Sequence, residues 1–482
     1  MNRRMILQLV CYILRIEALC LLPAAVVALF YQEWSSAMVL AVCAAGTAVV
    51  SLLTYLFRPK DRLIGAQEGF VITALSWIAV SVFGALPFWI SGSIPSFVDA
   101  LFETASGFTT TGASILNNVE ALPHGMLYWR SFSHWLGGMG VLVFLLAIVS
   151  MGKGENSLLH VMRAESPGPQ VDKLVPRIQK SAKILYLIYV VLTLIQIVFL
   201  LAGGMSVFDS VCTAYGTAGT GGFGVRNDSL ASYSPYLQNV CTVFMALFGV
   251  NFSIYYLLLL RQFTRVLRNV ELWVYIGIIV GVTAVITWNV LPMYAGFAES
   301  WHHAAFQVSS IMTTTGFATV DFDLWPSLSK TLLVALMIIG ACAGSTGGGM
   351  KVARLILMVK AARRSIRRML RPRSVAVVHM DGQQVEPDVV SNTYSYLTVY
   401  LFIAVLSMLV ISLDKFSLET NITAVLACLN NIGPGLDVVG PTRNYSEFSI
   451  LSKLVLTFNM LAGRLEIFPM LMLFIPSAWK RA

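Results

Sequence analysis

Four short turns rich in glycine and threonine recur along the chain, and their residue types suit the binding of an alkali cation. The turns span residues 109–114, 219–224, 313–322 and 430–436. A cation that has left water needs several oxygen ligands without a full negative charge that would trap it, and rings of backbone carbonyls meet that need. Glycine permits backbone conformations that direct carbonyls toward a common axis. The turns therefore predict a cation site built from main-chain oxygens.

Alignment of the four turns brings one glycine of each into register. We predict that the backbone carbonyls of this glycine and of the two residues before it line a cation path. The alternative, ordinary external loops with turn glycines, explains one or two such turns but not four in register. The predicted residues, here called the candidate filter, are Thr110, Thr111, Gly112, Thr220, Gly221, Gly222, Thr314, Thr315, Gly316, Asn431, Ile432 and Gly433.

A short helical segment precedes each turn and must position it. These segments span 97–107, 207–216, 300–312 and 418–429, and at about 1.5 Å per residue each reaches about half way across a bilayer. Irregular backbone at that depth is tolerated only where it lines a watery cavity. We therefore expect four helix–loop hairpins that enter from outside. Their C-terminal helix ends, which carry partial negative charge, would point at the cation path.

The composition places this arrangement in a membrane. Of the 482 residues, 57% are hydrophobic and 12% are charged, whereas soluble domains carry about 25% charged residues. The predicted fold is an all-α membrane protein with four membrane–pore–membrane repeats around a central pore, preceded by two extra transmembrane helices. The predicted units are an N-terminal two-helix unit, 1–62, and four repeats, 63–178, 179–268, 269–390 and 391–482.

The positive charges predict the orientation of the chain. Most of the 33 Lys and Arg residues lie in six clusters that alternate with apolar spans, so all six fall on one face, which the positive-inside rule assigns to the cytoplasm. We expect ten crossing segments with both termini in the cytoplasm, and no nucleic-acid partner despite the net charge of +9. The clusters are 3–4, 58–62, 153–183, 261–268, 351–373 and 480–481. The cluster at 351–373 suits either membrane lipid headgroups or a cytoplasmic protein partner.

A glycine-rich stretch, residues 340–351, interrupts what would otherwise be a single helix over 332–359. Consecutive glycines disfavour helix, and a loop below the third turn would lie across the cation path, although small residues also help membrane helices to pack. Arg464 lies inside the last apolar span, where a charge is costly unless it faces a cavity or a partner. The candidate gate comprises Gly344, Ser345, Thr346, Gly347, Gly348, Gly349 and Arg464.

Several patterns that suggest other chemistry lack the context that this chemistry requires. The glycines of residues 219–224 fit a dinucleotide-binding pattern, but no strand precedes them. The seven cysteines are scattered, so we expect no metal centre built from them. We find no nucleophile–base set and therefore do not expect an enzyme. We also expect no bound cofactor. Four acidic residues come just after the aligned glycines on the outer side and either concentrate cations at the mouth or cap local turns. They are Asp228, Asp321, Asp323 and Asp437.

The turns and the glycine-rich stretch together resemble the Trk/Ktr/HKT superfamily of cation transporters, and its TrkH branch in particular. The resemblance rests on FETASGFTTTGAS, GTAGTGGFG, MTTTGFAT and NNIGPG, with GACAGSTGGGMKV and AGRLEIFP. It implies a homodimer in the bacterial inner membrane that takes up potassium, and a cytoplasmic TrkA-type regulatory subunit that binds nucleotides. It also implies that a glycine at position 112 accompanies potassium selectivity, that residues 340–351 must move aside, and that Arg464 faces the pore as an electrostatic barrier.

The main alternative is a secondary transporter that couples cation movement to protons or sodium and selects potassium over sodium less strictly. Such transporters use inverted repeats, broken helices at mid-membrane and often an ionisable residue at the site. Here the four repeats point the same way, and the aligned turns carry glycine and threonine rather than carboxylates. The residues therefore favour a gated, channel-like pathway with K⁺ as the transported ion.

Overall fold

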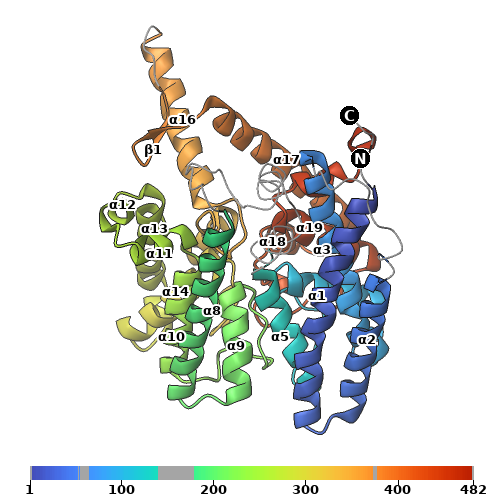
Figure 1. Cartoon of the computed structure of the whole chain (residues 1–482). Coiled ribbons are helices and arrows are strands. Elements are labelled where there is room, and N and C mark those ends of the chain that lie inside the picture. Colours follow the sequence, from blue (N-terminus) through green and yellow to red (C-terminus); the bar gives the residue numbers. More distant parts are fainter. Residues whose placement is uncertain are drawn as a thin grey trace.

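The computed structural model describes residues 3–52, 54, 65–138, 140, 178–372 and 377–479. These residues are almost entirely helical, and the predicted all-α architecture is confirmed (Figure 1). Their only sheet is a two-residue hairpin, β1 (His379–Met380) paired antiparallel with β2 (Gln383–Gln384). The boundary at residue 62, the clusters at 58–62 and 480–481, and most of the cluster at 153–183 lie outside the described residues.

Within the described ranges, six helices are long and apolar enough to cross a membrane. Two of them form the N-terminal unit, and the other four are the outer helices of the repeats, where continuous apolar sequence without internal glycine runs allows an unbroken helix. They are α1 (Arg3–Phe30), α2 (Trp34–Leu52), α3 (Ala66–Ile90), α8 (Ile178–Ala202), α13 (Val270–Val290) and α17 (Pro387–Ile411).

Each repeat then carries a short pore helix, as the sequence predicts. Serine side chains cap the first, second and fourth of these helices by accepting a hydrogen bond from a backbone N–H of the first turn. The third begins at Phe297, three residues earlier than predicted, and the second runs three residues further than predicted. The pore helices are α4 (Phe97–Phe108), α9 (Val207–Gly219), α14 (Phe297–Met312) and α18 (Leu418–Leu429).

Six rather than ten helices pass as full spans among the described residues, because the inner helices of repeats 2, 3 and 4 are broken and that of repeat 1 is described only as far as Gly138. The break in repeat 3 lies where the sequence predicts it, but the break after Gly249 in repeat 2, with an 87° bend, was not predicted. The inner helices are α5 (His124–Gly138) in repeat 1, α10 (Pro235–Phe248) and α11 (Phe252–Leu259), α15 (Ser327–Ile339) and α16 (Val352–Leu370), and α19 (Ile450–Arg464) and α20 (Phe468–Met472). Shorter elements are α12 (Phe263–Leu267) and the 3₁₀ turns Leu291–Met293, Phe322–Leu324, Ser412–Asp414, Asp437–Val439 and Pro476–Trp479.

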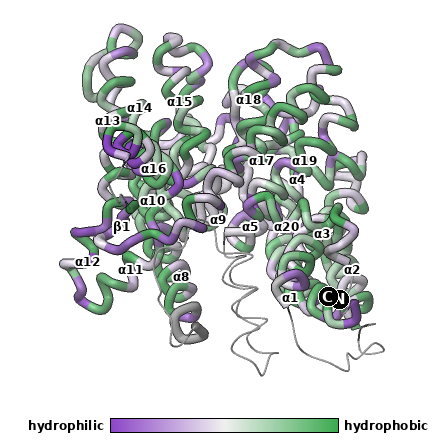
Figure 2. The backbone as a smooth tube through the Cα atoms, turned by 90° about the horizontal axis from the view of Figure 1, so that it is seen from above, coloured by the Kyte–Doolittle hydropathy of each residue, from purple (hydrophilic) through white to green (hydrophobic). Residues whose placement is uncertain are grey.

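The four repeats surround a common centre in chain order (Figure 2). The inner helix of each repeat contacts the pore helix of the next, through the pairs α5 with α9, α10 with α14, α15 with α18, and α19 with α4. The last pair closes the circle. Lys453 on α19 reinforces it, because its Nζ lies 2.7 Å from Oδ1 of Asp99 on α4.

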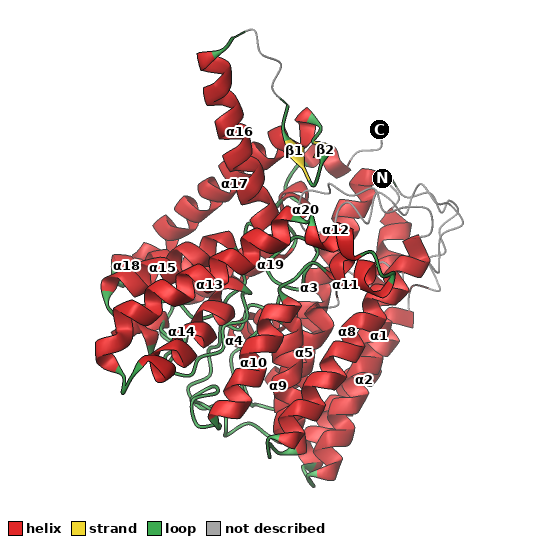
Figure 3. Ribbon diagram, turned by 90° about the vertical axis from the view of Figure 1, so that its left-hand side faces the viewer, coloured by secondary structure: helices red, strands yellow, loops and turns green. Residues whose placement is uncertain are grey.

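The basic helix α16 projects from one end of the molecule, and both chain termini lie at this end (Figures 1 and 3). The turn between α1 and α2 lies at the opposite end (Figure 1). The exposed side chains of the outer part of α16 alternate arginine with large apolar residues such as Ile366 and Met369.

Candidate cation pathway

The four pore helices end in the same backbone conformation. In each, a residue one or two positions after the helix end is left-handed, and the next N–H bonds to a carbonyl five residues back, as in a Schellman cap. All four of these hydrogen bonds measure 2.8 Å, from Thr111 to Ser106, Gly221 to Gly216, Thr315 to Ser310, and Ile432 to Ala427. The left-handed residues are Thr110, Thr220, Thr314 and Asn431, with φ from 54° to 61°. The sequence alignment of the four turns is therefore also a structural alignment.

The aligned glycines are left-handed too, with φ from 76° to 94°. Each one touches a backbone carbonyl of a neighbouring loop so closely that an added Cβ would clash with it. The contacts run from Gly112 to the Gly221 oxygen, Gly222 to the Thr315 oxygen, Gly316 to the Ile432 oxygen, and Gly433 to the Thr111 oxygen. The four loops thus form a closed cycle in which carbonyls at one register position meet the aligned glycines.

The four carbonyls of this cycle are free to bind a cation. None of them accepts a hydrogen bond from the residues that the structure describes. The Gly433 carbonyl differs, because it accepts a bond of 2.7 Å from Tyr445 Oη. In the fourth loop, Ile432 therefore offers a free oxygen, whereas the oxygen of Gly433 is already engaged.

Side chains behind the carbonyls brace the loops. Thr109 and Thr111 share a hydrogen bond of 2.8 Å between their Oγ1 atoms, and Thr313 and Thr315 repeat it at 2.7 Å. Asn431 Nδ2 donates to Thr111 Oγ1 at 2.9 Å and so joins the fourth loop to the first. These contacts link residues up to 320 positions apart, and no local sequence signal indicates them.

The loop between α15 and α16 lies directly against the candidate filter. Gly348 N–H donates to Thr314 Oγ1 at 2.6 Å, and Gly347 packs against the Thr313 carbonyl. Thr346 Oγ1 donates to the Phe248 carbonyl in repeat 2 at 3.3 Å. Gly348 also packs against the carbonyl of residue 430 in repeat 4. Residues of the candidate gate therefore contact three repeats at once.

Arg464 holds this loop to the remaining repeat. Its Nη1 donates to the Thr346 carbonyl and its Nη2 to the Gly137 carbonyl on α5, each at 2.7 Å. Glu466, two residues on, pairs with Arg354 on α16 instead of with Arg464. The structure thus brings the predicted gate residues 344–349 and Arg464 into one cluster beneath the four loops.

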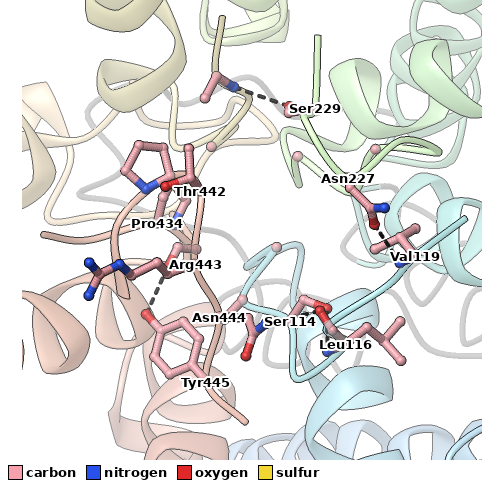
Figure 4. Close-up of a pocket in the computed structure, with 18 of the residues that line it drawn as sticks. Ser114, Leu116, Val119, Asn227, Ser229, Pro434, Thr442, Arg443, Asn444 and Tyr445 are labelled. Carbon is pink, nitrogen blue, oxygen red and sulfur yellow. Dashed lines mark hydrogen bonds between the residues drawn. The ribbon is translucent and has the colours of Figure 1, made fainter. Parts of the chain in front are cut away.

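A cavity of about 170 Å³ lies on the other side of the loops (Figure 4). All four aligned glycines line it, together with Arg130, Arg226 and Arg443. The four acidic residues predicted near the mouth are absent from its lining. Three of them tie loops together instead: Asp321 caps a 3₁₀ turn, Asp323 Oδ2 accepts the Asp437 N–H at 3.2 Å, and Asp437 contacts the start of α18. Among these residues, Asp321 fits the turn-capping alternative.

The comparisons with known proteins agree with this architecture. A family model described as TrkH, cation transport protein, matches residues 35–481. The chain belongs to the TrkH family. The Trk system potassium uptake protein TrkH of Escherichia coli K12 is 35% identical over 467 residues, 94% of each chain. The protein of the same name from Halomonas elongata is 33% identical over 491 residues and the full length of both.

A solved structure shows the same fold. The crystal structure of the potassium transporter TrkH from Vibrio parahaemolyticus matches with a TM-score of 0.89 and 31% sequence identity, over 100% of both chains. Because TrkH-family members are cation transport proteins, this chain is a multi-pass membrane transporter and not an enzyme.

In this TrkH-family chain, the lowered pKa of Asp437 leads us to expect a loss of stability at acidic pH. Hydrogen bonds from Ser417 and Thr420 at the start of α18 hold the pKa of Asp437 below its ordinary value. Because the pKa is lower in the folded state, this stabilisation is present above the ordinary pKa and is lost as pH falls through the lower one. We expect Asp437→Asn to lower Tm at about pH 6, and the difference from wild type to shrink toward about pH 3. Tryptophan fluorescence melts in detergent measure this; a Tm difference independent of pH would contradict it.

Proposed function

We propose that this chain carries K⁺ into the cell across the bacterial inner membrane, through the candidate filter. The observation that carries the proposal is the closed cycle of four loops, in which carbonyls in register carry no hydrogen bond from described residues. Such oxygens replace the hydration shell of an alkali cation. The pore helices add the partial negative charge of their C-terminal ends. Relatives named potassium uptake proteins support K⁺ as the ion.

The candidate gate completes this proposal. Residues 344–349 and Arg464 link all four repeats beneath the loops, so ion passage requires this cluster to separate. We assign its control to a cytoplasmic TrkA-type subunit that binds nucleotides, in an assembly with two copies of this chain. The basic helix α16 and both termini lie at the same end of the molecule (Figure 1), which supports a cytoplasmic face at that end under the positive-inside rule. Arginines on α16 suit lipid headgroups or this partner.

Flux into liposomes that contain the purified chain tests the function. We expect rubidium, used in place of potassium, to enter faster than sodium, and the rate to change when a TrkA-type subunit and nucleotide are supplied. Equal rates for both ions would contradict a selective filter. Uptake that stops when the proton or sodium gradient is collapsed would favour the alternative, a coupled secondary transporter.

A further inference from the structure

A buried ion pair lies beside the loops and belongs to neither the candidate filter nor the candidate gate. Arg130 Nε on α5 lies 2.6 Å from Glu103 Oε1 on α4, and the side chains are 3% and 0% exposed. Among the ion pairs of the described residues, this is the only one with both side chains almost fully inaccessible. Burial of two charges is costly unless each has further hydrogen-bond partners, so their other contacts indicate what the pair is for.

Glu103 fastens the first loop. Its carboxylate accepts hydrogen bonds from Ser114 Oγ at 2.9 Å and from the Ile115 N–H at 2.9 Å. These two residues follow Gly112 by two and three positions. The carboxylate therefore fixes the strand of chain that leaves the carbonyl cycle in repeat 1.

Arg130 bonds to the second loop just after its aligned glycine. Its Nη1 donates to the Gly224 carbonyl at 3.0 Å, two residues after Gly222. Its guanidinium carbon lies 3.5 Å from the centroid of the Phe223 ring. A planar guanidinium with several donors in a rigid fork can bond a carboxylate and a carbonyl together, which a lysine ammonium does less well. The Arg130 side chain thus connects Glu103, which holds the first loop, to the second loop.

His134, one helical turn after Arg130, makes a second bridge across the same seam. Its Nε2 accepts the Phe223 N–H at 3.1 Å, so its Nδ1 carries the proton and donates to the Gly107 carbonyl at 2.7 Å. With one nitrogen accepting and the other donating, the ring is neutral. Helix α5 therefore presents two side chains, one turn apart, that each join repeat 1 to the second loop.

The ion pair also neutralises the positive charge of Arg130 beside the cation path. Arg130 lines the outer cavity, where an unpaired positive charge would repel cations. Glu103 cancels that charge at contact distance. The chain thereby obtains a rigid, multiply bonded strut beside a cation path without adding a net positive charge there.

We propose that Arg130, held by Glu103, is a specificity-determining positioning residue that sets the spacing of loops 1 and 2. A smaller ion such as sodium requires the carbonyls to approach more closely, so a strut that fixes the separation of the Gly112 and Gly221 loops favours potassium. The inference rests on the proposed function, because it concerns the selectivity of the same pathway.

The test compares rubidium and sodium flux into liposomes for the full-length chain and three variants. Arg130→Lys keeps the charge and loses the fork, and we expect the rubidium-to-sodium flux ratio to fall roughly tenfold, equivalent to about 1.4 kcal/mol. Ser114→Ala removes one bond to Glu103 and leaves the ion pair intact, so we expect a smaller fall in the same direction. Combined, the two changes are expected to be less than additive, because they act on one network.

Arg226→Lys is the matched control. Arg226 lines the same cavity but donates to Ser232 Oγ at 2.8 Å and lies over Tyr233 rather than bonding a loop carbonyl. We expect its flux ratio to equal that of wild type. An unchanged ratio in a folded Arg130→Lys chain would overturn the proposal; if that variant does not fold, an unchanged ratio in Ser114→Ala would do so. A wild-type chain without rubidium preference would instead refute the proposed function itself.

Discussion

Replacing Gly316 with serine is expected to remove most potassium flux and to erode the preference for potassium over sodium. Gly316 has φ of +84°, a conformation that costs an L-residue roughly 1–2 kcal/mol. An added Cβ there would also clash with the Ile432 carbonyl, which is one of the four free oxygens of the cycle. The serine must therefore displace a proposed cation ligand, and not merely strain its own backbone.

Rubidium and sodium flux into liposomes measures both effects. Since about 1.4 kcal/mol corresponds to a tenfold change, backbone strain together with a displaced ligand leads us to expect a fall of at least tenfold in rubidium flux. Gly281→Ser on α13 is the matched control, because Gly281 is helical and an added Cβ would meet no atom within 4 Å. If Gly316→Ser transported rubidium with wild-type rate and preference, the candidate filter would be placed wrongly.

The backbone of the candidate filter could be predicted from the sequence because its demands are local. A left-handed residue packed against a neighbouring carbonyl requires glycine, so Gly112, Gly222, Gly316 and Gly433 record the loop geometry directly. The pore helices are likewise visible as short apolar segments ahead of each glycine. The interruption between α15 and α16 was predictable for the same reason, since its glycines cannot favour a helix.

Other features depend on contacts between distant residues and leave no local signal. Gly249 interrupts the inner helix of repeat 2 as a single glycine, a residue that many membrane helices tolerate. Its position is explained only by the packing of residues 342–344 against this break, where the Cys342 N–H donates to the Gly249 carbonyl at 3.1 Å. The roles of Arg130 and Glu103 were missed because their partners come from two repeats. The role of the acidic residues was ambiguous because a carboxylate can either cap a turn or concentrate cations at the mouth of the pathway.

Replacing Arg464 with alanine is expected to increase potassium flux in the absence of a regulatory subunit. The change removes the donors to the Thr346 and Gly137 carbonyls, which tie the loop between α15 and α16 to repeat 1. It also removes a positive charge from the space beneath the four loops. Hydrogen bonds that involve a charged group contribute about 1.5–3 kcal/mol each. Loss of about 3 kcal/mol from the closed arrangement would raise the ratio of open to closed protein roughly a hundredfold.

Arg464→Lys separates the two contributions, since lysine keeps the charge but cannot reproduce a guanidinium that bonds two carbonyls on different helices. Increased rubidium flux in both variants would assign the effect to the lost tether, whereas an increase in Arg464→Ala alone would assign it to the lost charge. Flux equal to wild type in both would exclude Arg464 from the gate. The tether is the stronger expectation, because Arg464 is the residue through which repeat 4 holds both the Thr346 carbonyl of repeat 3 and the Gly137 carbonyl of repeat 1. The loop contacts repeats 2, 3 and 4 directly, and Arg464 connects it to repeat 1, the fourth side of the pathway.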